Sequence, residues 1–160
     1  MRTGCLVVAA ALATLVSRQA QADLRLPDDQ VTLGPTFAYA YAPELEGALV
    51  YGVDAAAVYA IAWAGGGVRV FESFDADERT VLPYLEVGLW LLVNVGAGYT
   101  VDTSGRDALS GPHFFIGVPI PGIKDTFDGL LYVEPYYRAT YASVGTLYEG
   151  GAFVKWGSWK

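Results

Sequence analysis

The segment 132–141 alternates between two kinds of side chain along its whole length. Side chains of a β-strand point alternately to opposite sides of the sheet, so residues two apart share a face. One face of this segment therefore carries Glu134 and Arg138, and the other carries Val133 and Tyr137. The same alternation recurs along most of the chain beyond its N-terminal segment. This pattern predicts a protein built from strands that have one polar and one apolar face.

The first 22 residues have the three parts of a secretory signal peptide. Arg2 is followed by an apolar run over 6–16 and then by the small-x-small sequence Ala20-Gln21-Ala22. The apolar run is too short for a comfortable membrane-spanning helix. We therefore predict a signal peptide over 1–22 that is cleaved after Ala22, followed by one domain over 23–160.

Cleavage would remove the only cysteine and the only methionine of the 160-residue chain. The mature domain could then form no internal disulfide. Loss of Arg2 and Arg18 changes the net charge from −7 to −9, and this acidity argues against a nucleic-acid partner. Hydrophobic residues make up 53% of the chain, yet beyond Asp23 none of its apolar stretches reaches the length of a spanning helix.

Eight segments of the mature chain show the two-residue period, namely 31–41, 48–60, 63–71, 80–89, 92–102, 111–120, 130–141 and 146–159. Charged residues and most of the strand glycines share one face, whereas large apolar side chains occupy the other. Small and charged residues suit a crowded interior, and an apolar exterior suits lipid. A soluble barrel would have the opposite arrangement. The sequence therefore predicts an all-β fold, an eight-stranded antiparallel up-and-down transmembrane β-barrel.

The connections between these segments support the same architecture. Short turns near Ile61-Ala62 and Trp90-Leu91 alternate with polar, acidic connections over 73–79 and 103–110. Outer-membrane barrels combine short periplasmic turns with longer outer loops. Two connections depart from this rule, because 119–128 is long for a periplasmic turn and 142–145 is short for an outer loop.

With this strand series, the mature chain resembles the small eight-stranded outer-membrane proteins of Gram-negative bacteria, the OmpA and OmpX kind. The phrases Gly117-Val118-Pro119-Ile120-Pro121 and Tyr132-Val133-Glu134-Pro135-Tyr136-Tyr137-Arg138 are similar to those of uncharacterised exported barrels. The resemblance implies a fold, a location in the cell outer membrane, and assembly by the barrel-assembly machinery. Such barrels commonly end on an aromatic residue, whereas this chain ends Trp159-Lys160.

Eight ionisable residues are predicted to face the barrel interior as a lumen charge network: Asp54, Arg69, Glu86, His113, Glu134, Arg138, Glu149 and Lys155. They could line a conduit or a ligand site. An eight-stranded barrel is only wide enough for its own side chains, so we expect a structural network. The turn lengths further predict that Arg138 lies opposite Glu149 and that Asp54 lies opposite Arg69.

Catalytic chemistry would depend on His113, the only histidine. Ser110 lies three residues before it, and the acids Asp102 and Asp107 lie nearby. Outer-membrane lipid A deacylases resemble this fold but carry a His-x-Ser pair, whereas here the sequence is His113-Phe114-Phe115. We therefore expect no catalytic residues, and a lipid-modifying enzyme that uses His113 is the alternative.

The sequence predicts neither a metal site nor a cofactor. One histidine without a mature cysteine excludes the usual zinc ligand sets. The loop acids Asp75, Asp77 and Glu78 do not have the spacing of a calcium loop. Gly65-Gly66-Gly67 is not followed by the Lys-Ser/Thr of a phosphate-binding loop.

Aromatic residues near the predicted strand ends fit girdles at the two membrane boundaries: Tyr39, Tyr41, Tyr59, Trp63, Tyr99, Tyr141, Tyr148 and Trp156. A carbohydrate- or peptide-binding surface would use the same residue types. We predict a monomeric, non-enzymatic outer-membrane barrel with a structural, adhesion or envelope-maintenance role, with outer-membrane lipid as its partner. A soluble exported barrel that binds a small apolar ligand is a further alternative.

Overall fold

The computed structural model describes residues 29–43, 45–74, 79–90, 92–105, 108–124 and 129–159. The predicted signal peptide over 1–22 lies outside these residues, as do Asp75, Asp77, Glu78 and Asp107. The described residues contain strands and no helix: β1 (Asp29–Ala42), β2 (Leu45–Tyr59), β3 (Ala62–Ser73), β4 (Arg79–Trp90), β5 (Asn94–Thr100), β6 (Gly111–Gly117), β7 (Ile120–Lys124), β8 (Gly129–Ala142) and β9 (Gly145–Trp159).

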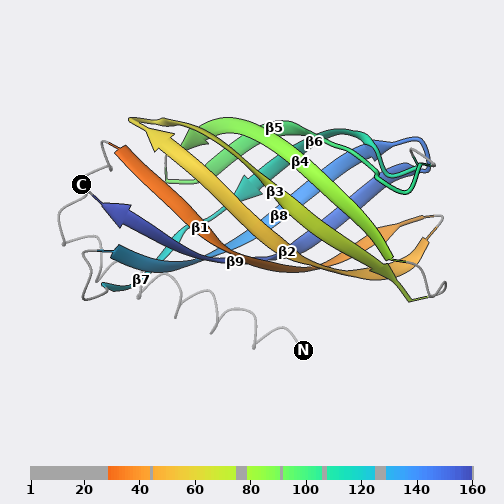
Figure 1. The fold of residues 1–160 in the computed structure, drawn as a ribbon, viewed down its shortest axis with the longest axis horizontal. Coiled ribbons are helices and arrows are strands. Elements are labelled where there is room, and N and C mark those ends of the chain that lie inside the picture. Colours follow the sequence, from red (N-terminus) through yellow and green to blue (C-terminus); the bar gives the residue numbers. More distant parts are fainter. Residues whose placement is uncertain are drawn as a thin grey trace, which may run out of the picture.

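The strands form a closed antiparallel barrel (Figure 1). Strands β1 to β5 each pair with the next along the chain, and β9 pairs with both β1 and β8. The circuit closes because β8 also pairs with β6 and then with β7. Strands β6 and β7 therefore occupy one strand position in the barrel wall, and the barrel has the eight strand positions that the sequence predicts.

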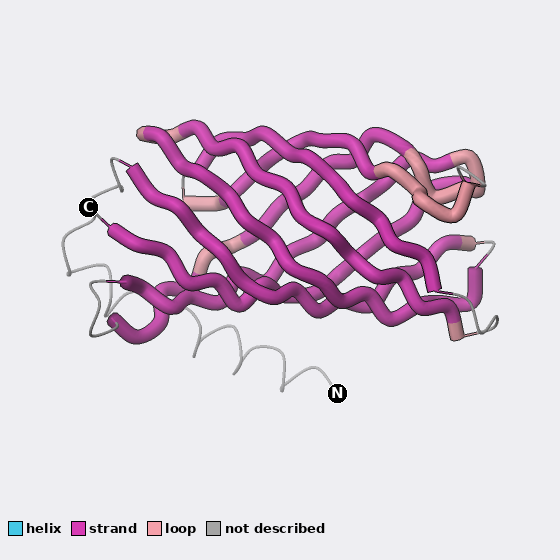
Figure 2. Tube along the Cα trace, viewed as in Figure 1, coloured by secondary structure: helices cyan, strands magenta, loops and turns pink. Residues whose placement is uncertain are grey.

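The two ends of the barrel are distinct, and the strands cross its wall obliquely from one to the other (Figure 2). At the terminal end, β1 begins and β9 ends side by side, with Gln30 paired to Trp159. The adjoining ends of β2 and β3, of β4 and β5, and of β7 and β8 also lie at this end. At the opposite end, which we call the loop end, lie the adjoining ends of β1 and β2, of β3 and β4, of β5 and β6, and of β8 and β9.

The sixth strand position is interrupted at Val118 and Pro119, between β6 and β7. Proline has no backbone N–H to donate to a neighbouring strand, so pairing stops at Pro119. The Val118 amide still donates to the Pro135 carbonyl at 3.0 Å, and pairing with β8 resumes at Ile120. The long predicted turn over 119–128 is therefore wrong in part, because Ile120–Lys124 forms β7.

The predicted register of β8 and β9 is confirmed. Tyr141 pairs with Thr146, and Arg138 lies directly opposite Glu149. Gly145 begins β9 with a φ of 104°, a backbone angle that residues with a side chain rarely adopt.

The predicted register of β2 and β3 is wrong by two residues. Asp54 lies opposite Gly67, and Arg69 lies opposite Gly52. The two-residue turn is Ala60-Ile61, one position earlier than predicted, with Ala60 in the left-handed region at φ 51°. Moving a hairpin turn by one residue shifts the cross-strand partner of every residue by two positions. Asp54 and Arg69 therefore still point inward, but they are not opposite each other.

The wall has an apolar outer face and a polar inner face. Large apolar side chains on the outside are exposed, including Leu85 at 74% and Val87 at 63%. The charged side chains of Glu134 and Arg138 point inward and are completely buried. Tyr137, Val95 and Ile116 are exposed, whereas Asn94 and His113 are buried, in agreement with the predicted faces.

An aromatic cluster fills the middle of the lumen. The Tyr136 and Phe153 rings stack at 4.3 Å, and Phe115 contacts Phe153 at 5.8 Å. Trp63 joins them from β3, with its ring 6.0 Å from that of Phe115. The expectation that Trp63 belongs to an exposed girdle is therefore wrong. Its indole packs over Gly88 and Gly96, where any β-carbon would lie 2.6 Å from it.

Candidate functional site

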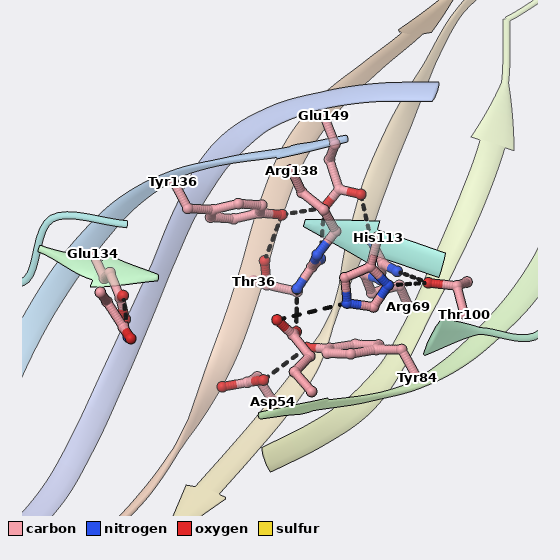
Figure 3. A network of polar contacts seen from close by, with 12 residues as sticks. Thr36, Asp54, Arg69, Tyr84, Thr100, His113, Glu134, Tyr136, Arg138 and Glu149 are labelled. Atoms are coloured by element: carbon pink, nitrogen blue, oxygen red, sulfur yellow. Dashed lines mark hydrogen bonds and ion pairs between the residues drawn. The ribbon is translucent and has the colours of Figure 1, made fainter. Parts of the chain in front are cut away.

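The candidate site is the network of charged side chains inside the barrel (Figure 3). The loop end above it is filled by buried apolar side chains: Val50, Phe71, Leu82, Leu109 and Leu147. Leu109 comes from the β5–β6 loop and belongs to the buried apolar cluster. That loop is attached to the β8–β9 turn, where the Ser143 hydroxyl donates to the Ala108 carbonyl at 3.2 Å. The charges therefore lie beneath an apolar closure.

Asp102 holds the β5–β6 loop in shape. Its carboxylate accepts hydrogen bonds from the backbone amides of Ser104, at 2.8 Å, and Leu109, at 3.2 Å. Burial favours the neutral acid, but the hydrogen bonds from Ser104 and Leu109 outweigh it and lower the pKa of Asp102 from its ordinary value of 3.8. The carboxylate form of Asp102 thus supports the closure over the lumen.

Four charged side chains form the centre of the network, and we call them the charge quartet: Arg69, Glu86, Arg138 and Glu149. Arg138 donates from one nitrogen to Glu86 and from the other to Glu149, the latter at 3.2 Å. Arg69 donates to the second oxygen of Glu149. The quartet carries two positive and two negative charges, so its net charge is zero. Buried ions are tolerated when they are paired and hydrogen-bonded in this way.

Tyr84 organises both arginines. Its ring lies 4.5 Å from the Arg69 guanidinium carbon and 4.7 Å from that of Arg138, within cation–π range. Its hydroxyl donates to Asp54 Oδ2 at 2.7 Å. Tyr136 provides a second link, because its hydroxyl donates to Glu149 and contacts the Thr36 hydroxyl at 3.2 Å.

His113 is bound to the quartet from β6. Its Nδ1 lies 3.0 Å from Thr100 Oγ1, and its Nε2 lies 3.7 Å from Glu86 Oε2. Arg69 donates to the same Thr100 oxygen at 2.8 Å, which leaves the Thr100 hydroxyl proton for His113 Nδ1. This arrangement fits a neutral imidazole that carries its proton on Nε2, towards Glu86. The ring has room because its partner across β5 and β6 is Gly98, where a β-carbon would lie 2.7 Å from Nε2.

A second group lies nearer the terminal end, and we call it the terminal-end cluster: Asp54, Asn94, Glu134 and Lys155. The Lys155 ammonium lies 2.6 Å from Asp54 Oδ1 and 3.5 Å from Glu134 Oε2. The Asn94 amide nitrogen donates to Glu134 Oε1 at 2.8 Å. Figure 3 shows Glu134 lying apart from the charge quartet.

The structure places all eight residues of the lumen charge network inside the barrel, each at most 5% exposed. Asp54, Glu134 and Lys155 gather in the terminal-end cluster, and the other five gather around Arg138. Asp54 and Arg69 are brought to Tyr84 rather than to each other. The network also includes uncharged residues that are not among the eight predicted from the sequence: Thr36, Tyr84, Asn94, Thr100 and Tyr136. Their inward positions in the alternation could have identified them.

Ser110 and His113 do not form the pair that nucleophilic catalysis would need. The Ser110 hydroxyl accepts a hydrogen bond from the Asp102 amide at 2.8 Å, and His113 is bound to Thr100 and Glu86. Histidine, cysteine, aspartate and glutamate form no group of three or more that could hold a metal ion within the described ranges.

The described part of the chain contains no helix that is long and apolar enough to cross a membrane. No protein-family model, curated protein or solved structure matches this chain.

Proposed function

We propose that this chain is a non-enzymatic outer-membrane barrel protein with a structural, adhesion or envelope-maintenance role. The observation that carries the proposal is the reversed polarity of the wall. Charged side chains fill the interior, whereas apolar side chains such as Leu85 and Val87 cover the exterior. Soluble monomers rarely expose apolar patches larger than a few hundred Å². A bilayer is the solvent that suits this exterior.

The length of the strands also supports a location in a bilayer. Strands of 12 to 15 residues, such as β2, β4 and β9, rise by about 3.3 Å per residue. At a tilt of about 40° they span roughly 30 Å or more, enough for an apolar band of about 25 Å.

The exposed aromatic residues support the same orientation. Tyr39, Tyr41, Tyr99, Tyr141 and Tyr148 are exposed towards the loop end, and Tyr59 and Trp156 are exposed towards the terminal end. Amphipathic rings of this kind favour the headgroup boundary. We infer that the loop end faces outward and the terminal end faces the periplasm, with outer-membrane lipid around the wall and a monomer assembled by the barrel-assembly machinery.

The contents of the lumen favour a structural role over the alternatives. The charge quartet and its aromatic neighbours fill the centre, and Leu109 with its apolar neighbours covers it. An apolar ligand would find the lumen already occupied by these side chains. A lipid-modifying enzyme would need an accessible His113, which is 1% exposed.

Cell fractionation tests the location. Overproduced full-length protein should sediment with outer membranes and require detergent for release. Recovery from the periplasm without detergent would contradict the membrane proposal. His113→Ala tests the role, because an enzyme would lose lipid turnover while the barrel stays folded. We expect the lipid composition of the membranes to be the same with His113→Ala as with the unmodified protein.

A further inference from the structure

The terminal-end cluster has an uncompensated negative charge. Its carboxylates belong to Asp54 and Glu134, and its one cation is Lys155. The charge quartet beside it is balanced and has no cation to spare, because both of its arginines bind its own glutamates. The imbalance is therefore local.

Lys155 is shared by both carboxylates and lies closer to Asp54 than to Glu134. Its ammonium is 2.6 Å from Asp54 and 3.5 Å from Glu134, and the Tyr84 hydroxyl completes the environment of Asp54. Glu134 is completely buried, Asn94 donates a hydrogen bond to its Oε1, and its Oε2 shares the Lys155 ammonium with Asp54. A buried carboxylate that must share its only counter-charge with a second carboxylate is unfavourable.

Asn94 Oδ1 is buried and has no hydrogen-bond partner among the described residues, and the only cation near Glu134 Oε2 is the Lys155 ammonium at 3.5 Å. Asn94 is 4% exposed, and the same amide group already donates to the Glu134 carboxylate. The unpartnered amide oxygen therefore belongs to the side chain that is hydrogen-bonded to the carboxylate with the incomplete counter-charge. Oxygen ligands of this type suit hard cations.

We propose that Glu134 and Asn94 bind a monovalent alkali cation, such as sodium, in the terminal-end half of the lumen. One positive charge balances the cluster, whereas a divalent ion would overcompensate it. The site needs only the closed barrel, so it does not depend on the membrane location proposed above.

Unfolding of the purified full-length protein in detergent tests this site. The urea midpoint is measured in sodium chloride and in choline chloride at equal ionic strength, because choline has the same charge but is too bulky for the lumen. A bound cation stabilises the folded state by mass action. We expect the midpoint to rise with sodium concentration and to stay lower in choline chloride.

Glu134→Gln keeps the shape of the side chain and removes its charge. This variant should fold and lose the difference between sodium and choline. Glu72→Gln is the matched control, because Glu72 pairs with the exposed Arg79 at 2.9 Å, away from the lumen, and should keep the sodium response. If Glu134→Gln does not fold, Asn94→Leu replaces it and should need more sodium for the same rise.

Three results would overturn the proposal. The first is an equal midpoint in sodium and choline chloride for the unmodified chain. The second is a sodium response that persists in Glu134→Gln, or that is unchanged in Asn94→Leu. The third is an infrared band of a protonated carboxyl that disappears in Glu134→Gln, which would show that a proton takes the place of the cation.

Discussion

Arg138 is the residue on which the charge quartet depends most. It is completely buried and is the guanidinium that binds both Glu86 and Glu149. Glu149 keeps Arg69 if Arg138 is removed, but Glu86 then has only His113, at 3.7 Å. A substitution of Arg138 is therefore unfavourable mainly because it leaves the Glu86 carboxylate buried without a cation.

We therefore expect Arg138→Met to destabilise the barrel by about 3–5 kcal/mol, the usual effect of breaking a buried pair. The double variant Arg138→Met with Glu86→Gln should be more stable than Arg138→Met, since it removes both charges. Urea unfolding of the four proteins in a double-mutant cycle measures this coupling. Strictly additive effects would mean that the two side chains do not compensate each other.

Asp102 makes the closure of the loop end depend on pH. Its pKa is lower in the folded protein, because Ser104 and Leu109 donate hydrogen bonds to the carboxylate. Its stabilising effect is therefore complete above the ordinary pKa of 3.8 and is lost as the pH falls through the lower folded value. Exchange of the Leu109 amide proton, corrected for intrinsic rates, should accelerate in that acidic range. In Asp102→Asn this additional acceleration should be absent.

At the scale of elements, alternation was sufficient to find the strands. Segments 31–41 and 146–159 correspond to β1 and β9 within a few residues, because a half-buried strand needs one polar and one apolar face. The β2–β3 register was missed because Ala60-Ile61 has none of the usual turn residues. The end of β6 was missed because Val118 continues the alternation, and only Pro119 marks the break.

The β2–β3 turn offers a test of this explanation. Ala60 has a φ of 51°, and the left-handed region costs an L-residue about 1–2 kcal/mol. Glycine avoids that cost but loses more backbone entropy on folding. We expect Ala60→Gly to stabilise the barrel by roughly 0.5–1 kcal/mol. A lower urea midpoint for this variant would argue against the assigned turn.

At the scale of the whole molecule, barrel closure creates contacts that neighbouring strands cannot predict. Arg138 and Glu149 are adjacent in a hairpin, so their pairing followed from register. Arg69 and Glu149 lie on β3 and β9, which are not paired, and they meet across the lumen. The inward positions could be predicted from alternation, whereas the partners across the lumen depend on the tilt and stagger of the closed barrel.

The central claim is that the apolar exterior faces a bilayer, and a charge placed at mid-height on the wall tests it most directly. Leu85 lies in the middle of β4, and Leu92 lies in the β4–β5 turn at the terminal end, with both side chains exposed. The free energy of unfolding is measured in phospholipid vesicles for Leu85→Arg and Leu92→Arg. The bilayer account predicts a loss of about 2–4 kcal/mol for Leu85→Arg and about 0–1 kcal/mol for Leu92→Arg. Equal, small effects at both positions would contradict it.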